Sequence, residues 1–156
     1  MLDAGAIRRA TYRDLDQMIE VEQRCFTSYL AYSRRQLQYL LTEANSDCFA
    51  EVVHDSLRGF IIVLYRENAT VAGIETLNVD PLHHGKGIGI RLLQAAEEEM
   101  FIHDIKRIRL EVRINNLPAI KLYQRAGFET VAFLPNYYLV DCNGSRDAFR
   151  MVKKLT

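Results

Sequence analysis

Apolar and polar positions change their period several times along the chain. From residue 11 to residue 41 the apolar side chains recur every three or four positions, which predicts two amphipathic helices. From residue 47 to residue 79 they form runs rich in β-branched and aromatic side chains, which predicts three successive strands. Phe60 to Tyr65 is continuously apolar, so we expect a central strand that is buried on both faces.

Capping and breaking residues set the ends of these elements. Thr11-Tyr-Arg-Asp14 and Ser33-Arg-Arg-Gln36 are both typical of a helix start, because the first side chain can accept a bond from the backbone N–H three residues later. Pro81 ends the third strand of the meander, since proline cannot donate to a ladder. A short helix is expected at 118–126, and Gly127 is well suited to end it.

The alternation of elements indicates one mixed α/β domain that spans residues 1–156. The predicted order is β-α-α-β-β-β-α-β-α-β-β, and the longest helical pattern follows a glycine-rich stretch. Strands are expected at 7–10, 47–54, 57–65, 69–79, 107–112, 128–134 and 147–155. The chain is 49% hydrophobic and 26% charged, which is typical of a globular domain and argues against disorder.

Charge and metal-ligating residues narrow the function classes. Lys plus Arg is 20 and Asp plus Glu is 20, so we expect no nucleic-acid partner, which would favour a basic excess. The three cysteines lie far apart and the four histidines show no zinc spacing, which favours free thiols and predicts no metal site. Neither an apolar signal region nor a membrane-length run occurs, so the expectation is a cytoplasmic protein without a membrane partner.

The stretch from residue 77 to residue 92 carries the clearest chemistry. A strand ends, the chain turns through His84-Gly-Lys-Gly-Ile-Gly89, and a long helix starts. Glycines let backbone N–H groups approach an anion, and a helix N-terminus adds partial positive charge. The pattern predicts a phosphate or pyrophosphate site, but its spacing fits neither a P-loop nor a dinucleotide fold. A flexible turn without a ligand is the alternative.

The glycine stretch and the strand end before it resemble the acetyl-CoA loop of the GNAT family of N-acetyltransferases, in which Gln/Arg-x-x-Gly-x-Gly/Ala follows a strand. Further motifs follow at the spacing usual in that family, and together they resemble its RimI-like branch, which acetylates the N-terminal amine of a ribosomal protein. These motifs are Val79-Asp80-Pro81, Leu110-Glu-Val-Arg113, Asn116-Leu-Pro-Ala119, Leu122-Tyr123, Gly127-Phe128, Asn136-Tyr-Tyr138 and Asp147-Ala148.

The resemblance implies the single-domain GNAT fold with acetyl-CoA as cosubstrate. It places the pantetheine arm and the acetyl carbonyl on the backbone of Leu77, Asn78 and Val79. It places the pyrophosphate on the N–H groups of Gly85, Lys86, Gly87, Ile88, Gly89 and Ile90. His84 departs from the family's Gln or Arg, and we expect it to donate toward the pyrophosphate or to be a solvated loop residue. Asn116 matches an asparagine that contacts coenzyme A, and it is equally suited to cap the helix after it.

The resemblance also assigns the chemistry. Glu111 matches the base and Tyr123 the acid that protonates the leaving sulfur. Their alternatives are a salt bridge to Arg109 or Arg113 and a half-buried packing tyrosine. Tyr137 and Tyr138 are expected to line the acceptor groove, unless they form a surface aromatic pair; these two residues complete the candidate site.

The first hypothesis for function is acetyl transfer to the N-terminal amine of a protein or peptide, a ribosomal protein being the target that the branch suggests. The segment 25–33, which forms part of the acceptor site in the family, lacks the Pro and Trp usual in that branch. This departure keeps a small-molecule amine acetyltransferase as the second hypothesis. The third is a non-catalytic acetyl-CoA-binding module, which the joint presence of Glu111, Asn116 and Tyr123 disfavours. Nothing in the pattern specifies an oligomeric state.

Overall fold

The computed structural model describes residues 5–27 and 29–155. Its helices and strands follow the predicted order, and their ends differ from the predicted ones by one or two residues at most of the boundaries. In chain order they are β1 (Ala6–Arg9), α1 (Leu15–Cys25), α2 (Arg34–Thr42), β2 (Ser46–Val53), β3 (Ser56–Tyr65), β4 (Val71–Val79), α3 (Ile88–Ile102), β5 (Arg107–Arg113), α4 (Leu117–Arg125), β6 (Glu129–Leu134) and β7 (Ala148–Lys154).

Both predicted capping boxes are present. Ser33 Oγ accepts a hydrogen bond from the Gln36 backbone N–H at 3.1 Å, and Gln36 Oε1 accepts one from the Ser33 N–H at 2.8 Å. The box of Thr11 and Asp14 closes a single 3-10 turn, and α1 begins directly after it. The helices therefore begin where the sequence pattern indicates.

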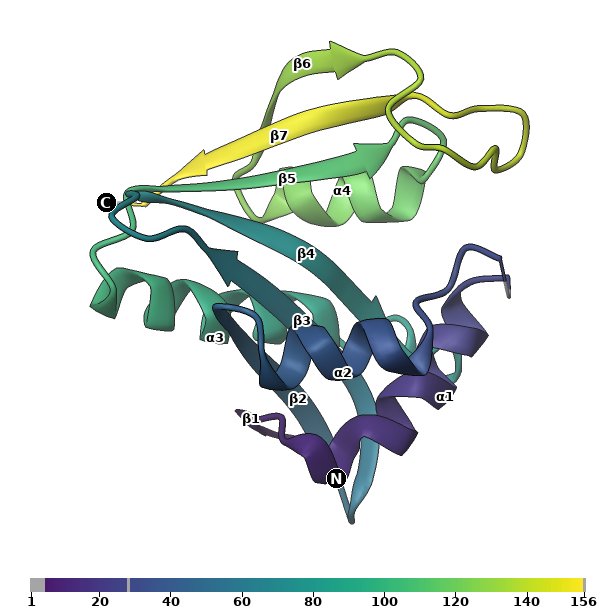
Figure 1. Ribbon diagram of the computed structural model, residues 1–156, viewed down its shortest axis with the longest axis vertical. Helices are drawn as coiled ribbons and strands as arrows, with labels where there is room; N and C mark the ends of the chain where they lie inside the picture. Colours follow the sequence, from purple (N-terminus) through teal and green to yellow (C-terminus); the bar gives the residue numbers. More distant parts are fainter. Residues whose placement is uncertain (1–4, 28, 156) are drawn as a thin grey trace.

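The strands of the described chain form one seven-stranded sheet in the order β1-β2-β3-β4-β5-β7-β6. All neighbouring pairs are antiparallel except β4 and β5, which are parallel. That pair is joined only where 71–73 meets 107–109, and beyond Gly73 the two strands separate (Figure 1). The sheet is thus opened along its middle, and the edge of β4 that faces β5 has no strand partner after Gly73.

A bulge in β4 lies where the two strands separate. Ile62 of β3 pairs with Thr76 and Val63 pairs with Ile74, so Glu75 has no partner of its own on β3. A bulged residue bends its strand and increases its twist. The bend turns the last part of β4 away from β5, which places Glu75 near the vertex of the opening.

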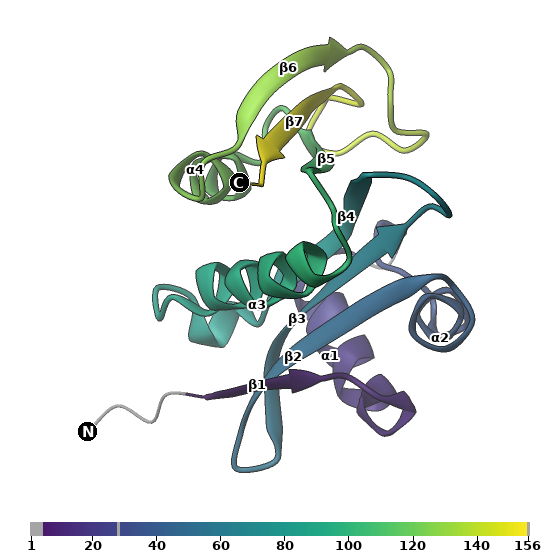
Figure 2. The same ribbon diagram turned by 90° about the vertical axis from the view of Figure 1, so that its left-hand side faces the viewer.

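Helices cover both faces of the sheet, and β3 divides the core between them (Figure 2). Ile61 and Val63 belong to a cluster built with α3 and α4, while Phe60 and Ile62 belong to one built with α1 and α2. The prediction of a strand buried on both faces is confirmed through Val63; the last two residues of β3 are half-buried.

Two glycines allow the helices to approach closely. A Cβ on Gly59 of β3 would lie 2.9 Å from the Asn78 carbonyl oxygen and 3.1 Å from Ile88 Cγ2. A Cβ on Gly89 of α3 would lie 3.0 Å from Leu122 Cδ2 of α4. All three distances are tighter than ordinary van der Waals contact, so the start of α3 sits against β3, β4 and α4 only because these positions lack a side chain. This packing fixes the glycine-rich loop at the end of β4.

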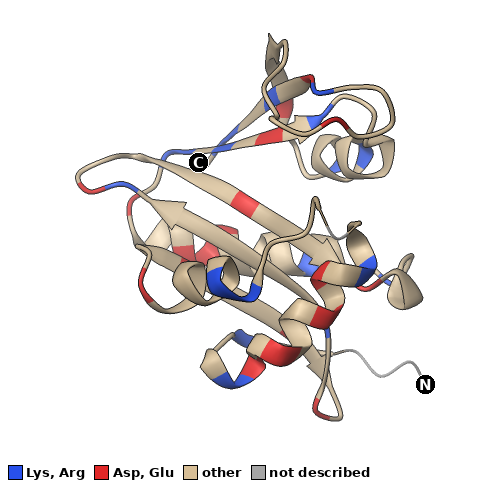
Figure 3. Cartoon of the chain, turned by 45° about the vertical axis from the view of Figure 1, so that its right-hand side comes forward, with Lys and Arg blue, Asp and Glu red and all other residues tan. Residues whose placement is uncertain are grey.

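No helix in the described part of the chain is long and apolar enough to cross a membrane. Basic and acidic residues are interspersed over its helices and strands (Figure 3). Cys25, Cys48 and Cys142 are free thiols, as the sequence predicts.

Candidate active site

A cleft of about 500 Å³ lies where β4 and β5 begin to separate. It is bordered by residues 71–75 of β4 with the end of β3 and the turn between these strands, and by β5 and the β6–β7 connection on the other side. Its charged and aromatic lining consists of Arg66, Glu75, Arg109, Glu111 and Tyr137. Two of the residues that the sequence selects, Glu111 and Tyr137, are therefore brought together here.

The glycine-rich loop begins where β4 ends. Gly85 and Gly87 have φ angles of 79° and 77°, in the left-handed region that residues with a Cβ rarely adopt. Gly87 is the N-cap of α3 and has no side chain to occupy the helix end. The first N–H groups of a helix have no partner within it, so those of Ile88, Gly89 and Ile90 face the turn. The geometry is suited to an anion, in agreement with the sequence prediction.

His84 turns back toward the strand. Its Nε2 lies 2.9 Å from the Val79 carbonyl oxygen, at hydrogen-bond distance, with Nε2 as donor. The neighbouring His83 accepts a hydrogen bond at Nδ1 from Lys86 Nζ, 3.2 Å away. The two histidines thus brace the loop. His84 contacts one of the backbone groups assigned to the pantetheine arm rather than a group on the phosphate side.

The end of β4 is tied to α1 by a buried acid. Leu77 and Asn78 pair with β3, and the buried Asn78 side chain donates through Nδ2 to Glu22 Oε2. Glu22 is 1% exposed, and its burial raises the pKa of its carboxyl. One edge of this part of β4 is paired with β3, and the other edge is the one that β5 leaves unpaired. Alternate backbone N–H and C=O groups of residues 77–79 therefore point into the opening.

Glu111 forms the ion pair that the sequence analysis kept as an alternative, with Arg109 but not with Arg113. Its Oε2 lies 3.0 Å from Arg150 Nε and 3.4 Å from Arg109 Nε. Its Oε1 accepts a hydrogen bond from the Tyr137 hydroxyl at 3.3 Å. Both carboxylate oxygens of Glu111 are therefore engaged by neighbouring side chains. Arg150 comes from β7, distant in sequence, and the motif gave no sign of it.

Tyr123 belongs to the core cluster on the α3 side of the sheet and does not line the cleft. It is 7% exposed, and its ring meets Phe128 edge-on with centroids 5.6 Å apart. Burial raises the pKa of its hydroxyl, so the proton stays on the oxygen throughout the neutral range. Packing and proton donation are compatible, since a buried tyrosine presents an apolar ring and one polar atom.

Tyr137 and Tyr138 form an edge-to-face pair with centroids 5.0 Å apart. Tyr137 is part of the cleft lining, while the Tyr138 ring lies under the Arg113 guanidinium, 4.0 Å from its centroid. Burial raises the pKa of Tyr138 to about 12.

Asn116 is a helix cap, its Oδ1 accepting from the Ala119 N–H at 3.4 Å.

Sequence reasoning missed a second acidic group in the cleft. Glu75, the bulged residue, accepts a hydrogen bond from the Tyr32 hydroxyl, and the Tyr32 backbone N–H donates to Glu22 Oε1 at 3.0 Å. Among the described residues Glu75 forms no ion pair. These contacts fasten the 25–33 segment to β4; residue 28 of that segment lies outside the described part. The one available signal was an acid, Glu22, on the apolar face of the first helix.

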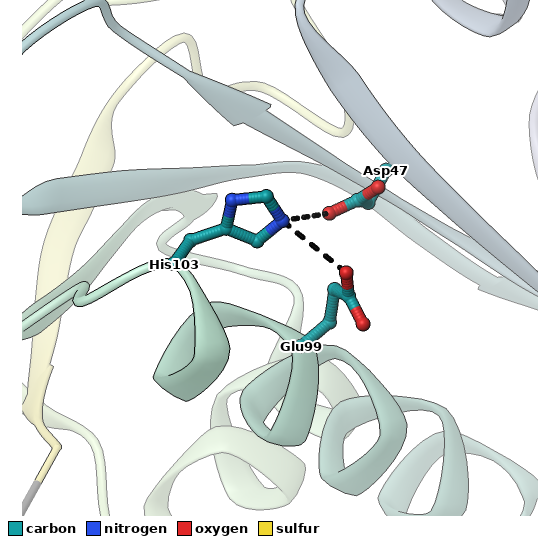
Figure 4. Close-up of side chains that lie close together, drawn as sticks. All are labelled: Asp47, Glu99 and His103. Carbon is teal, nitrogen blue, oxygen red and sulfur yellow. Dashed lines mark hydrogen bonds and ion pairs between the residues drawn. The ribbon is translucent and has the colours of Figure 1, made fainter.

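One group of potential metal ligands lies elsewhere, at the far end of α3 (Figure 4). His103 Nε2 is 3.2 Å from Glu99 Oε1 and 3.7 Å from Asp47 Oδ2. Arg9 already pairs with both carboxylates, at 2.6 Å and 2.7 Å. A guanidinium in this position satisfies the acids that a cation would need. None of the three potential ligands lines the β4–β5 cleft.

Comparisons with known proteins agree with this geometry. The model of the Acetyltransferase (GNAT) family matches residues 15–128. An N-alpha-acetyltransferase of Sulfurisphaera tokodaii is 26% identical over 158 residues, covering 96% of this chain and 92% of that protein. The ribosomal-protein-S18-alanine N-acetyltransferase of Escherichia coli superposes with a TM-score of 0.85 at 25% identity, over 97% of this chain and 94% of that one.

Ard1 of Thermoplasma volcanium has the same TM-score, 0.85, at 27% identity and with 99% of both chains covered. The matched region of the family model contains the split strands, the glycine-rich loop and Tyr123. With the fold, the loop and the matched region in agreement, the chain belongs to the GNAT family of N-acetyltransferases, enzymes that take their acetyl group from acetyl-CoA.

Proposed function

We propose that the protein transfers the acetyl group of acetyl-CoA to the N-terminal α-amine of a protein or peptide, directly and within a ternary complex. The observation that carries this proposal is the separation of β4 from β5, which leaves the edge of β4 unpaired from Gly73 to the glycine-rich loop, with a cleft that has two carboxylates where the separation begins. Support for a peptide acceptor comes from the relatives, several of which are named N-alpha-acetyltransferases. A ribosomal protein is the acceptor that the Escherichia coli structure suggests.

The cosubstrate fits the residues at the end of β4. The open edge of Leu77, Asn78 and Val79 offers backbone groups to the pantetheine arm, as a strand partner would. The N–H groups from Gly85 to Ile90, which include Lys86 and Ile88, converge on the turn and receive the pyrophosphate. A Cβ at either left-handed glycine would strain this turn. Asn116 can cap α4 and still turn its amide toward the cosubstrate.

Three groups carry the chemistry. Glu111 takes the proton of the amine through a water molecule, because both of its oxygens are already engaged. An α-amine has a pKa of about 8, so a modest base is sufficient. Glu75 carries an unpaired negative charge in the same cleft and attracts the acceptor in its ammonium form. Tyr123 gives its proton to the departing sulfur.

The acceptor enters between the 25–33 segment and the β6–β7 connection. Tyr32 from the first and Tyr137 from the second each hold one cleft carboxylate. Tyr138 supports Tyr137 through their ring contact. Tyr32 and Tyr137 thus place hydroxyl groups next to the two cleft carboxylates, which suits hydrogen bonding to a peptide main chain. The proposed compartment is the cytoplasm, a reducing environment in which the three free cysteines stay reduced.

The test is an acceptor screen with the whole protein. Acetyl-CoA is supplied with a library of peptides that carry free N-termini and, in parallel, with small primary amines, and the release of coenzyme A thiol is followed. The proposal expects thiol release with peptides and at most slow release with small amines. Turnover with small amines alone would establish the small-molecule alternative, and binding of acetyl-CoA without any turnover would establish a binding module.

A further inference from the structure

Three charged side chains meet next to the glycine-rich loop, at the junction of β2, β3 and α3; two of them are buried and the third, Arg91, is partly exposed. Glu51 of β2 is 0% exposed and Arg58 of β3 is 7% exposed. Arg58 Nη2 lies 2.9 Å from Glu51 Oε2, and Arg91 Nε of α3 lies 2.6 Å from Glu51 Oε1. Removing charged groups from water is costly even when they are paired. Hydrophobic side chains at these positions would cost less free energy to bury, so the presence of charged ones needs an explanation.

The reason is visible in the second contact of Arg91. Its Nη1 donates to the backbone carbonyl oxygen of Lys86 at 2.8 Å. Lys86 lies between the two left-handed glycines, and a Cβ on Gly87 would be only 3.1 Å from the same Nη1. One guanidinium therefore bridges the buried Glu51 carboxylate and the tip of the loop. The planar fork of arginine makes two such contacts in fixed directions.

The other end of the loop is held by the same strand. The Asp80 backbone N–H donates to the Arg58 carbonyl oxygen at 2.8 Å, immediately before the loop starts. The Asp80 side chain, 3% exposed, accepts from the Leu82 N–H at 3.0 Å and pairs with Arg24. Residues 80–87 are thus fixed at both ends through Arg58, by its backbone at one end and by its partner Glu51 at the other.

The charges do not cancel. Among the residues that the structure describes, two guanidinium groups face one carboxylate, which leaves one net positive charge next to the loop. Arg58 Nε is buried without a hydrogen-bond partner. In a buried setting a charge acts over a longer distance than at the surface, because the local dielectric constant is low. Arg91 brings this charge to the loop itself through its contact with the Lys86 carbonyl oxygen, and a positive charge there favours an anion.

We propose that Glu51, Arg58 and Arg91, the charged triad, hold the loop in its anion-binding shape and add a positive field next to it. They are positioning residues: Arg91 acts through the Lys86 carbonyl, and the other two act through Arg91. The proposal rests on the proposed function, since it takes the loop to be the pyrophosphate site. A triad that served only to stabilise the fold would affect all ligands equally, and this difference provides the test.

The experiment compares two probes by calorimetry: coenzyme A, which has the pyrophosphate, and pantetheine, which lacks it. Arg91→Met keeps most of the side-chain stem but removes both contacts. We expect the Kd for coenzyme A to rise about tenfold, equivalent to about 1.4 kcal/mol, while the Kd for pantetheine stays the same. Arg9→Met is the matched control, because Arg9 also bridges two carboxylates but lies at the far end of α3. It should leave both Kd values unchanged.

A second variant keeps the proposal testable if Arg91→Met does not fold. Arg91→Lys keeps the charge but cannot make both directed contacts, so an intermediate rise in the Kd for coenzyme A is expected. Equal weakening of both probes by either variant, or no weakening of coenzyme A, would overturn the role of the triad while leaving the proposed function intact. If the unaltered protein bound no coenzyme A, the proposed function itself would fail and the triad proposal with it.

Discussion

The two ends of the β4–β5 opening are built in different ways. At the loop end, one continuous stretch provides the binding groups, and most of these are backbone N–H groups set by glycines. At the cleft end, the polar groups are side chains from α1, the 25–33 segment, β4, β5, β7 and the β6–β7 connection. Acetyl-CoA is the same in every turnover, so backbone groups are sufficient to bind it. The acceptor is selected by side chains, which amino-acid substitution can change.

This contrast predicts that changes at the cleft end alter turnover and acceptor use, while changes at the loop end alter acetyl-CoA affinity. The largest effect is expected for Tyr123→Phe, which removes the proposed acid and keeps the ring that packs on Phe128. We expect kcat to fall about ten- to a thousand-fold, the range of lost acid–base assistance, with the KM for acetyl-CoA unchanged. Steady-state kinetics measure kcat and KM, and Tyr39→Phe, which changes an exposed tyrosine of α2, is the control. Turnover at the unaltered rate would remove Tyr123 from the mechanism.

The next effect separates the two carboxylates of the cleft. Glu111→Gln should lower kcat about tenfold to a hundredfold, because it removes the proposed base. Glu75→Gln should instead raise the KM for the amine, since it removes the charge that attracts the ammonium form. Kinetics with one peptide acceptor at several pH values distinguish these outcomes. A loss of kcat in Glu75→Gln with normal kcat in Glu111→Gln would exchange the two roles.

A smaller effect is expected at the loop end. Gly87→Ala places a Cβ at a φ of 77°, which costs about 1 kcal/mol in the left-handed region, and brings it to 3.1 Å from Arg91. We expect the affinity for coenzyme A to fall about tenfold while kcat at saturation changes little. Gly144→Ala is the matched control: its φ is 84°, and no atom lies within 4 Å of its Cβ. Both variants should lose stability, but only the first should lose affinity, as calorimetry will show.

The smallest effect is a change in stability with pH at Glu22, the buried acid that contacts Asn78 at the loop end and Tyr32 at the cleft end. The folded-state pKa of Glu22 is raised, so the folded protein holds its proton to higher pH than the unfolded chain does. The carboxyl then favours folding more as the pH falls from neutral through the folded-state pKa, and the gain is complete below the unfolded value. The unfolding free energy of the unaltered protein, minus that of Glu22→Gln, should therefore rise as the pH is lowered from 7 to 5. Denaturant titrations measure it; a difference that falls toward acid pH would contradict the assignment.

The same contrast explains what the sequence could and could not predict. The element order, the capping boxes and the doubly buried β3 follow from local periodicity, and the structure confirms them. The left-handed glycines of the loop are also a local signal. Arg150, Glu75 and Tyr32 reach the site through strand register, a bulge and a loop closure, which depend on residues far apart. No short motif contains such information.

His84 shows the limit of a motif within the loop itself. The family pattern suggested a donor toward the pyrophosphate, but the ring reaches the Val79 carbonyl oxygen on the strand side. The contact to Val79 depends on how the loop folds back on the strand, which the motif does not specify.

The central claim is that the acceptor is an N-terminal α-amine, and two peptides test it most directly. Both contain an internal lysine and differ only in whether the N-terminus is free or blocked, and mass spectrometry after incubation with acetyl-CoA locates any acetyl group. The account predicts acetylation of the free peptide at its first residue and no reaction of the blocked one. Acetylation of the lysine in both peptides would contradict it.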